Sequence, residues 1–312
     1  MDMMSVDDVV LTADPDVWRP GDSWLAGGTV LLSYGTDIIR GRPRRLLDLT
    51  AANWPEVTWR RDDTGGPVAL ELAATCRVAS VFRLPRSEAL PTDCRELAGL
   101  DLFRPCCDSF VASWKIWNVS TVGGNVATSL PAGPMISLLS GLDAEAFLVG
   151  PGGDRRVVPV SELVLGEACN GIGDGELVRS FTIPVAALRQ PCAYRRISLR
   201  ERGRSAALLI GRRTGPRRVR IVVTASTRRP HVVDLGGPDR PSTAEVWRQL
   251  VDAVVTPDGW HDDMHGAPDW RRAMTHRLGD EILAELLPDH RTGTGDARGR
   301  CTGDIRLERR VS

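Results

Sequence analysis

Two short segments, each with a pair of adjacent glycines, constrain this chain more than any other feature. The first is Leu-Ala-Gly-Gly-Thr at residues 25–29, and the second is Thr-Val-Gly-Gly-Asn at residues 121–125. Glycine tolerates positive φ and close approach of the backbone, and the small polar residue beside each pair can hydrogen-bond locally. Backbone N–H groups gathered at such turns bind anions. We therefore expect two turns, each following a strand-like run, that face each other across a cleft and bind a pyrophosphate.

The hydrophobic pattern of the remaining chain predicts both strands and helices. Strands are expected at residues 24–26, 46–49, 68–72, 145–149, 155–160, 205–211 and 218–226, with 110–114 leading toward the second glycine segment. Helices are expected at residues 87–100, 135–142, 243–254 and 270–287, and a partly helical return at 30–39. The Gly-Pro-Gly-Gly-Asp sequence at 150–154 lies between two expected strands, so its glycines predict a hairpin turn.

Composition is that of a globular protein without a strong electrostatic preference. The 312 residues are 42% hydrophobic and 26% charged, and 40 basic residues balance 40 acidic ones. A neutral chain has no overall field that attracts nucleic acid or acidic membranes. No apolar run approaches the ~20 residues that a membrane-spanning helix needs, and Asp2, Asp7 and Asp8 replace the basic start of a signal peptide. We expect a cytoplasmic protein.

The cysteines and histidines predict no metal centre on this chain. The seven cysteines are scattered without a C-x-x-C pair, which fits neither a disulfide framework nor an iron–sulfur site. Adjacent Cys106 and Cys107 are expected on a helix, with at least one of them packed as a small apolar residue. His261 and His265 stand among aspartates, glycine and proline, which favours a structural loop over a zinc site.

The sequence also lacks the common dinucleotide-binding strings. No G-x-G-x-x-G occurs between a strand and a helix, and no G-x-x-x-x-G-K-[ST] is present. If the chain binds a dinucleotide, it does so in a fold other than the Rossmann fold.

Several segments in a fixed order resemble one known family. Residues 26–30 with Arg-Leu-Leu-Asp-Leu at 45–49 form the first group, and residues 117–125 with Ser-Leu-Pro-Ala-Gly-Pro at 129–134 form the second. Further landmarks occur at residues 74–76, 175–177, 183–184 and 194–196. Over about residues 20–290, this order resembles the FAD subunit of molybdenum hydroxylases. That family is the medium subunit of carbon monoxide dehydrogenase and the xanthine dehydrogenases.

The resemblance implies an α+β protein with a two-subdomain, non-Rossmann FAD-binding fold of the vanillyl-alcohol oxidase type. This domain is expected at residues 1–185, with subdomains at about 1–55 and 56–185. A small α/β C-terminal domain of the carbon monoxide dehydrogenase flavoprotein type is expected at 190–290, and a flexible tail at 291–312.

The resemblance also implies which residues bind FAD. Two cradles are expected to hold the pyrophosphate, made by Leu25, Ala26, Gly27, Gly28, Thr29 and Val30, and by Thr121, Gly123, Gly124 and Asn125. An aromatic residue beside the flavin ring and a basic residue near it correspond to Tyr194 and Arg196. No residue of this chain is expected to act as a catalytic acid or base.

Three positions depart from the family pattern. Val30 replaces a residue that is commonly polar, Trp117 replaces a frequent arginine, and Pro134 replaces the usual aspartate near the flavin. Proline has neither an N–H donor nor an acceptor side chain. The cradle glycines are kept, so the departures concern the surroundings of the flavin ring.

The function implied by the resemblance is electron transfer through FAD. Substrate oxidation would occur at molybdopterin on a large partner subunit. Electrons would pass through 2Fe–2S clusters on a small partner subunit to this FAD, and then to an acceptor. Two alternatives remain open: a stand-alone flavin oxidoreductase, and a flavin-free scaffolding subunit of the same complex.

Overall fold

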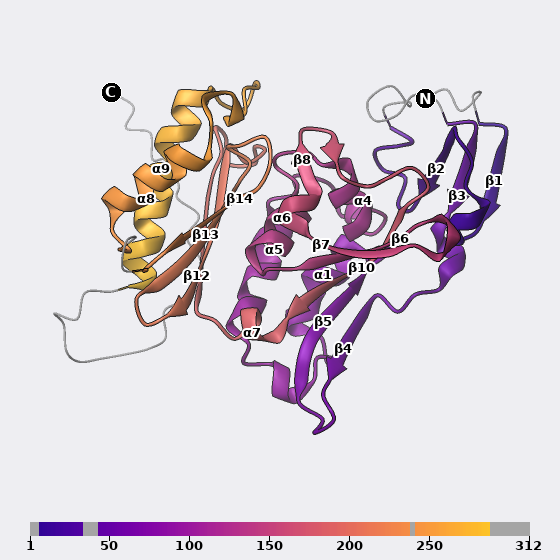
Figure 1. Ribbon diagram of the computed structural model, residues 1–312, viewed down its shortest axis with the longest axis horizontal. Helices are drawn as coiled ribbons and strands as arrows, with labels where there is room; N and C mark the ends of the chain where they lie inside the picture. The colour runs from indigo at the N-terminus through magenta and orange to yellow at the C-terminus, as the bar shows by residue number, and fades with distance from the viewer. Residues whose placement is uncertain (1–5, 34–42, 238–240, 288–312) are drawn as a thin grey trace.

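The computed structural model describes residues 6–33, 43–237 and 241–287, and within them the strands form separate sheets joined by helices (Figure 1). The N-terminal sheet has the strand order β1-β3-β2, with both pairs parallel. Its strands are β1 (Asp8–Leu11), β2 (Asp22–Leu25) and β3 (Arg45–Asp48). Because β2 ends at Leu25, the first glycine segment begins at the carboxyl end of a strand, as predicted.

The central sheet is antiparallel and has the strand order β4-β5-β10-β6-β7. Its strands are β4 (Val57–Arg61), β5 (Pro67–Ala73), β6 (Glu145–Val149), β7 (Arg155–Pro159) and β10 (Leu177–Pro184). The predicted hairpin is therefore confirmed, since β6 pairs with β7 around residues 150–154. Short strands β8 (Val164–Gly166) and β9 (Cys169–Asn170) form a separate pair.

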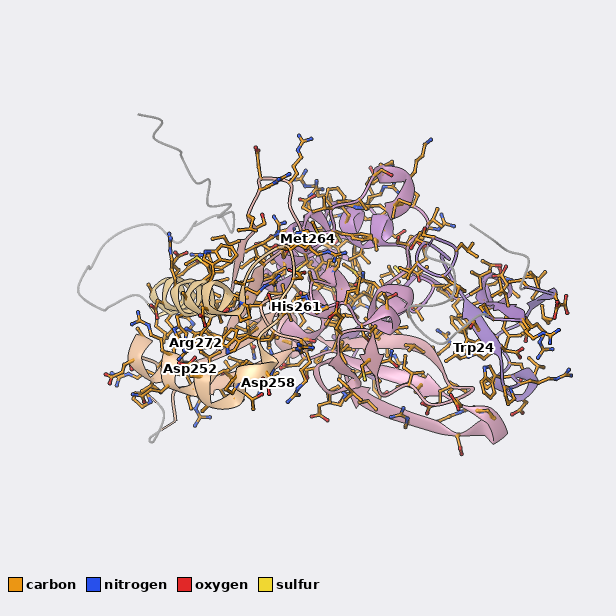
Figure 2. The ribbon with its side chains drawn as sticks, turned by 90° about the horizontal axis from the view of Figure 1, so that it is seen from above. Trp24, Asp252, Asp258, His261, Met264 and Arg272 are labelled. Atoms are coloured by element: carbon orange, nitrogen blue, oxygen red, sulfur yellow. The ribbon has the colours of Figure 1, made fainter. Side chains whose placement is uncertain are left out.

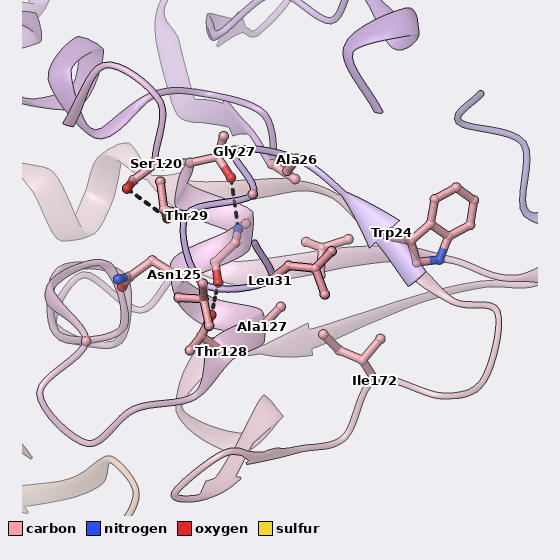
Figure 3. A pocket seen from close by; sticks show the side chains of 18 of the residues that line it. Trp24, Ala26, Gly27, Thr29, Leu31, Ser120, Asn125, Ala127, Thr128 and Ile172 are labelled. Atoms are coloured by element: carbon pink, nitrogen blue, oxygen red, sulfur yellow. Dashed lines mark hydrogen bonds between the residues drawn. The ribbon is translucent and has the colours of Figure 1, made fainter. Parts of the chain in front are cut away.

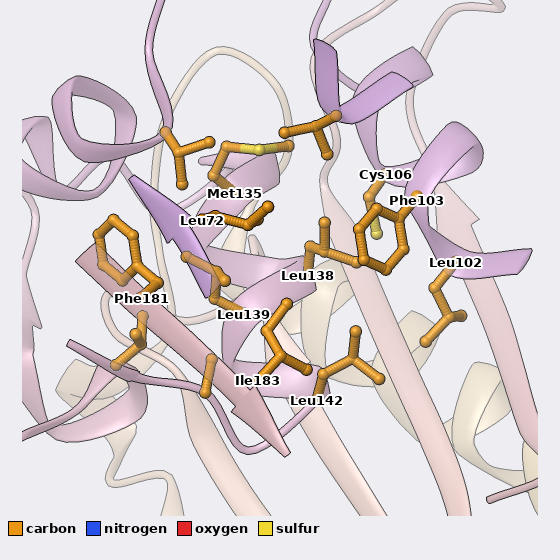
Figure 4. Packing of buried hydrophobic residues seen from close by; sticks show 14 of the residues in the cluster. Leu72, Leu102, Phe103, Cys106, Met135, Leu138, Leu139, Leu142, Phe181 and Ile183 are labelled. Carbon is orange, nitrogen blue, oxygen red and sulfur yellow. The ribbon is translucent and has the colours of Figure 1, made fainter. Parts of the chain in front are cut away.

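Helices cover one face of the central sheet and bury its apolar side chains (Figure 4). They are α1 (Val78–Arg83), α2 (Phe103–Asp108), α3 (Trp114–Trp117), α4 (Val122–Thr128), α5 (Pro134–Gly141), α6 (Val160–Leu163) and α7 (Val185–Leu188). Leu72 and Phe181 from the sheet share this core with Phe103 and Leu138 from the helices. Cys106 and Cys107 lie on α2 and are buried, as expected.

The C-terminal part forms a second layered unit (Figure 1). Its antiparallel sheet has the order β11-β12-β13-β14, and α8 and α9 pack on one face. The elements are β11 (Cys192–Ile197), β12 (Ala207–Gly215), β13 (Arg218–Thr224), β14 (His231–Leu235), α8 (Ala244–Val254) and α9 (Pro268–Leu286). The two helices and two central strands match the sequence prediction closely.

Helix α5 joins the two units. All eight of its residues are buried, because the central sheet lies on one side and the C-terminal sheet on the other. Alternation along β12 explains this contact: Leu209 packs toward α8 and α9, whereas Leu208 and Ile210 belong to the core that contains α5. A Cβ added to Gly141 would lie 2.7 Å from the Ile210 side chain, so glycine permits this close packing.

Two local predictions are wrong. Residues 87–100 do not form a helix, since short 3-10 turns occupy Leu84–Arg86, Thr92–Cys94 and Ala98–Leu102. Pro91 interrupts this stretch because proline lacks an N–H and disfavours helical geometry in the preceding residue.

The second error concerns the approach to the second glycine segment, which is helix α3 instead of a strand. The segment itself opens α4, with Thr121 as its N-cap. Residues 30–33 form turns, and most of the predicted return at 30–39 lies outside the described residues, as does the predicted tail at 291–312.

Candidate functional site

Both glycine segments line one pocket of about 340 Å³ (Figure 3). This volume lies in the range of small-molecule sites. The first segment contributes Leu25, Ala26, Gly27, Gly28, Thr29, Val30 and Leu31. The second contributes Ser120, Thr121, Gly123, Gly124, Asn125, Ala127 and Thr128. Residues about one hundred positions apart are thus brought together at one site.

The first segment contacts the residues that immediately precede the second one. The hydroxyl groups of Thr29 and Ser120 are 3.2 Å apart and share a hydrogen bond (Figure 3). A Cβ added to Gly27 would lie 2.1 Å from the carbonyl oxygen of Val119. Glycine is needed at position 27 because its backbone touches that of Val119 and Ser120, just before the second segment. The joined segments therefore form one continuous part of the pocket wall.

The first segment lines the pocket, and several of its backbone N–H groups have no acceptor among the described residues. Among the described residues, no acceptor is within hydrogen-bond distance of the N–H groups of residues 27–31. The turn is held instead by the N–H groups of Leu32 and Ser33, which donate to the carbonyls of Gly28 and Val30 at 2.8 and 3.0 Å. Gly28 has φ +66°, a conformation that favours glycine. Successive free N–H groups in a turn suit an anion.

The second segment uses its donors internally. The N–H groups of Val122 and Gly123 donate to the carbonyls of Cys76 and Ala74, both at 2.8 Å. The Gly124 N–H donates to Thr121 Oγ1 at 3.0 Å, which caps α4. The Asn125 N–H donates to the Thr121 carbonyl at 3.0 Å. The second segment therefore supports the pocket without offering these four N–H groups to a ligand.

The glycines of the second segment also have different roles. A Cβ on Gly123 would lie 2.6 Å from Ala74 Cβ, so this glycine allows α4 to pack against the end of β5. A Cβ on Gly124 would meet only Thr121 Oγ1 among the described atoms, at 3.0 Å. Gly124 therefore leaves open the part of the pocket that it lines. The Asn125 side chain accepts from the Met135 N–H at 3.0 Å and fixes the start of α5.

Aromatic and charged residues complete the pocket lining. Trp18 and Trp24 belong to the N-terminal part, and the indole N–H of Trp24 is buried without an acceptor among the described residues. Asp22 pairs with Arg45 through contacts of 3.0 and 2.5 Å. Burial alone would raise the pKa of Asp22, but hydrogen bonds from Arg45 and the Arg19 backbone outweigh burial and lower it.

The other carboxylate in the pocket lining, Glu176, is also paired. Arg156 donates to both of its oxygens at 2.7 and 2.6 Å, and this hydrogen bonding lowers the pKa of Glu176. Among the described residues, Arg204 is the remaining charged residue in the lining. The paired carboxylates contribute little net charge, so Arg204 gives the pocket a positive character.

Tyr194 and Arg196 do not line this pocket. The Tyr194 hydroxyl donates to the Pro105 carbonyl at 3.2 Å, and its ring is buried in the core. Arg196 donates to Ser205 Oγ at 2.7 Å and to the Gly203 carbonyl. The roles expected for them beside the flavin ring stay predictions. Of the three departures from the family pattern, Val30 and Pro134 line the pocket, whereas Trp117 is buried beside Phe82.

Residues outside the pocket have structural roles. His261 is buried, and burial lowers its pKa despite the nearby Asp263. Its loop lies well apart from Trp24 (Figure 2). Within the described residues, no group of three or more His, Cys, Asp or Glu side chains could hold a metal ion. Burial also raises the pKa values of the Cys106 and Cys107 thiols, so these groups are protonated and unreactive.

Comparison with known sequences identifies the class of domain. Residues 66–186 match the family described as the FAD binding domain in molybdopterin dehydrogenase. The resemblance inferred from the glycine segments is therefore confirmed, and this part of the chain is similar to the FAD-binding domain of that oxidoreductase family. The match contains the second glycine segment, and the first lies outside it.

A curated relative and several solved structures agree with this family. The chain is 26% identical to xanthine dehydrogenase 2 of Arabidopsis thaliana over 136 residues, which are 44% of this chain and 10% of the plant protein. The structure of quinoline 2-oxidoreductase from Pseudomonas putida 86 superposes with a TM-score of 0.69 and 18% identity. That superposition covers 92% of this chain and 100% of the other.

Carbon monoxide dehydrogenase provides a second structural match. The enzyme from Oligotropha carboxidovorans superposes with a TM-score of 0.68 and 20% identity, over 90% of this chain and 97% of that chain. The Hydrogenophaga pseudoflava enzyme lacking the Mo-pyranopterin moiety superposes with a TM-score of 0.67 and 19% identity. That superposition covers 89% of this chain and 96% of the other. These likenesses confirm the α+β fold across most of the chain. No helix in the described ranges is long and apolar enough to cross a membrane.

The residues of the pocket fit FAD. The N–H groups of residues 27–31, which have no acceptor within the described ranges, suit the pyrophosphate. The rings of Trp18 and Trp24 offer apolar aromatic surface, and Arg204 offers positive charge. The second glycine segment fits as the support on which the first one rests.

Proposed function

We propose that this chain is the FAD-binding subunit of a molybdopterin-dependent hydroxylase or dehydrogenase. Its task is to hold FAD between a metal-containing partner and an electron acceptor. The observation that carries the proposal is the row of N–H groups at residues 27–31 that lack acceptors in the described part of the chain, in a pocket shared with the family-matched α4. FAD supplies the redox chemistry, since a flavin accepts electrons singly and releases two.

The residues of the chain would bind and orient the cofactor. The N–H groups of Gly27, Gly28, Thr29, Val30 and Leu31 would donate to the pyrophosphate. Ser120 and Thr29 would keep that loop in place through their shared hydrogen bond. No side chain in this account removes a proton from an organic substrate.

The proposal includes two partner subunits, one with molybdopterin and one with 2Fe–2S clusters. The cysteines support this division of cofactors, because Cys76, Cys94, Cys106, Cys107 and Cys192 are buried and distributed through the fold. In this proposal the electrons for the flavin come from another chain. Co-purification of the tagged chain with the products of neighbouring genes tests the assembly. A monomer that reduces its own flavin with substrate would instead indicate a stand-alone oxidoreductase.

The first test of function is the visible spectrum of the purified chain. We expect a yellow protein that releases FAD and not FMN on denaturation, because the family that matches residues 66–186 is described as FAD-binding. A protein that stays colourless after incubation with FAD would contradict the proposal and favour a scaffolding subunit.

A matched pair of variants tests the location of the cofactor. Gly124→Asp places a carboxylate in the open part of the pocket, where it would repel the pyrophosphate and block its space. Gly166→Asp is the control, because Gly166 also has open space around its Cα but lies outside the pocket. We expect at least a tenfold loss of FAD affinity in Gly124→Asp, about 1.4 kcal/mol, and none in the control. Equal flavin-to-protein ratios would show that FAD binds elsewhere.

A further inference from the structure

An aromatic cluster that includes an exposed tryptophan lies on helix α3, just before the second glycine segment. The ring centroids of Phe82 and Trp117 are 5.2 Å apart, and Trp114 lies 5.7 Å from Trp117 and 6.2 Å from Phe82. Trp117 is 8% exposed, whereas Trp114 is 47% exposed. Since Trp117 replaces a residue that is frequently arginine in the family, the cluster is a feature of this particular chain.

Three further apolar side chains close to Trp114 in the sequence are exposed. Val111, Ile116 and Val119 have exposed fractions of 53%, 37% and 49%. Exposed apolar side chains that gather in one place and have polar neighbours mark interaction sites. We name residues 111–119, together with Phe82, Arg83 and Arg104, the α3 surface.

Hydrogen bonds hold the α3 surface in one conformation. The indole N–H of Trp117 donates to the Phe110 carbonyl at 3.1 Å. The Asn118 side-chain amide donates to the Trp114 carbonyl at 2.7 Å. Ser113 is the N-cap of α3. A surface that is already ordered loses little conformational entropy when a partner binds.

The charged groups of the α3 surface are mainly basic. Arg83 and Arg104 each have their guanidinium group over a ring of the aromatic cluster, 4.8 and 3.9 Å from the ring centroid. Lys115 is exposed on α3, and Asp108 at the end of α2 is the nearest acidic residue in the sequence. Tryptophan and arginine are also the residues that dominate binding energy at interfaces. By charge complementarity, the α3 surface fits an acidic protein.

The α3 surface lies beside the pocket and leaves it open. Phe110 and Val111 line the pocket before α3, and Ser120 lines it after α3, whereas no residue of α3 itself is part of the lining. The Val119 carbonyl also lies against Gly27 of the first glycine segment. A protein bound over α3 would therefore come close to a ligand in the pocket without entering the pocket.

The small size of the α3 surface favours a brief contact over a permanent one. Stable interfaces use about 20–30 residues on each side, and those of permanent complexes are larger and more apolar. Complexes between electron-transfer proteins bury the least area. A few exposed apolar side chains among cations match this last class.

We propose that the α3 surface docks an acidic one-electron carrier protein, which takes electrons from the flavin in the pocket. The inference rests on the proposed function and names the class of its electron acceptor. Each docked carrier is reduced by one electron. A flavin reduced by two electrons is therefore oxidised by two successive carriers, and the protons that it loses pass to water.

The test mixes the FAD-loaded full chain, reduced with dithionite under anaerobic conditions, with one of two haem proteins. The first is cytochrome c, which is basic, and the second is cytochrome c with succinylated lysines, which is acidic. Haem absorbance measures the rate constant of electron transfer. Because the chain has no net charge, its overall charge favours neither probe. We expect the acidic probe to react at least about tenfold faster at low salt, and its advantage to shrink at high salt.

A matched pair of charge reversals locates the docking site. Lys115→Glu changes the charge on α3, and Arg155→Glu makes the same change on β7, at an exposed residue outside the pocket lining. We expect Lys115→Glu to slow the acidic probe about fivefold at low salt and hardly at all at high salt, because a charge at an interface acts mainly on association. Arg155→Glu should change neither rate.

A second pair tests the apolar contact. Trp114→Ala should slow the acidic probe about fivefold at both salt concentrations, as expected for an interface tryptophan. Val157→Ala on β7 is the control, since Val157 is 56% exposed. Flavin content and thermal unfolding establish that each variant is folded and loaded.

The other possible results contradict the inference. Equal rates in Lys115→Glu and Arg155→Glu, or an acidic probe no faster than the basic one, would overturn docking at α3 while FAD binding stands. Lys115-dependent binding to phosphatidylserine vesicles, without a preference for the acidic probe, would overturn it by assigning the surface to a membrane. If the wild-type chain binds no FAD, the proposed function itself fails, and this inference fails with it.

Discussion

The two glycine segments look alike in sequence and do different work in the structure. The first ends strand β2 and leaves the N–H groups of residues 27–31 without acceptors among the described residues. The second opens helix α4, and its N–H groups at residues 122–125 all have partners within the chain. The first is thus suited to bind a ligand, and the second to support the first. A paired glycine motif is therefore evidence of tight backbone geometry before it is evidence of a phosphate site.

The largest expected effect that tests this comparison comes from Gly27→Ala. The new Cβ would lie 2.1 Å from the Val119 carbonyl oxygen, so the two backbones must separate. We expect more than a tenfold loss of FAD affinity and a loss of stability of about 1–3 kcal/mol, as for overpacked sites. Flavin fluorescence and thermal unfolding measure the two quantities.

Gly166→Ala is the control for that variant, because its Cβ would meet only Cys169 Cβ at 3.7 Å. If Gly27→Ala keeps full FAD affinity, direct contact between the segments is not what shapes the pocket, and the comparison fails.

Thr121→Ala tests the supporting role of the second segment and should have a smaller effect. It removes the hydrogen bond from the Gly124 N–H to Thr121 Oγ1, and loss of a threonine N-cap costs about 1 kcal/mol. We expect a lower unfolding temperature but FAD affinity within about twofold, since a cap worth so little need not move the first segment. A large loss of flavin with unchanged stability would mean that the second segment binds the ligand directly.

Much of this fold could be predicted from the sequence because its signals are local. The hairpin at 145–159 follows from a glycine-rich turn between alternating apolar residues, and α5 from a continuous apolar run. Residues 87–100 were misread because their spacing is helical, yet Pro91 and tertiary packing favour short 3-10 turns. Local patterns cannot weigh such long-range packing.

The site was harder to predict because it depends on partners far away in the sequence. The sequence indicated the glycines of both segments but not their contacts. The Gly123 N–H donates to the Ala74 carbonyl, and Gly27 must be glycine because the Val119 carbonyl lies against it. Arg204 was missed altogether, since one arginine in an arginine-rich chain carries no sequence signal.

The smallest expected effect concerns pH and again separates the two segments. Asp22, on the strand that leads into the first segment, has a lowered pKa: hydrogen bonds from Arg45 and the Arg19 backbone outweigh its burial. A carboxyl whose pKa is lower in the folded state stabilises the fold above its unfolded pKa of about 3.9, and this contribution is lost as the pH falls below that value. The N-terminal sheet should therefore loosen first in acid.

Hydrogen exchange at pH 5 and pH 3 should show earlier loss of protection in β2 and β3 than in α4. In Asp22→Asn the difference in the protection of β2 and β3 between pH 5 and pH 3 should shrink, because the asparagine side chain does not titrate. Equal acid sensitivity of β2 and α4 in the wild type would mean that this ion pair does not distinguish the segments.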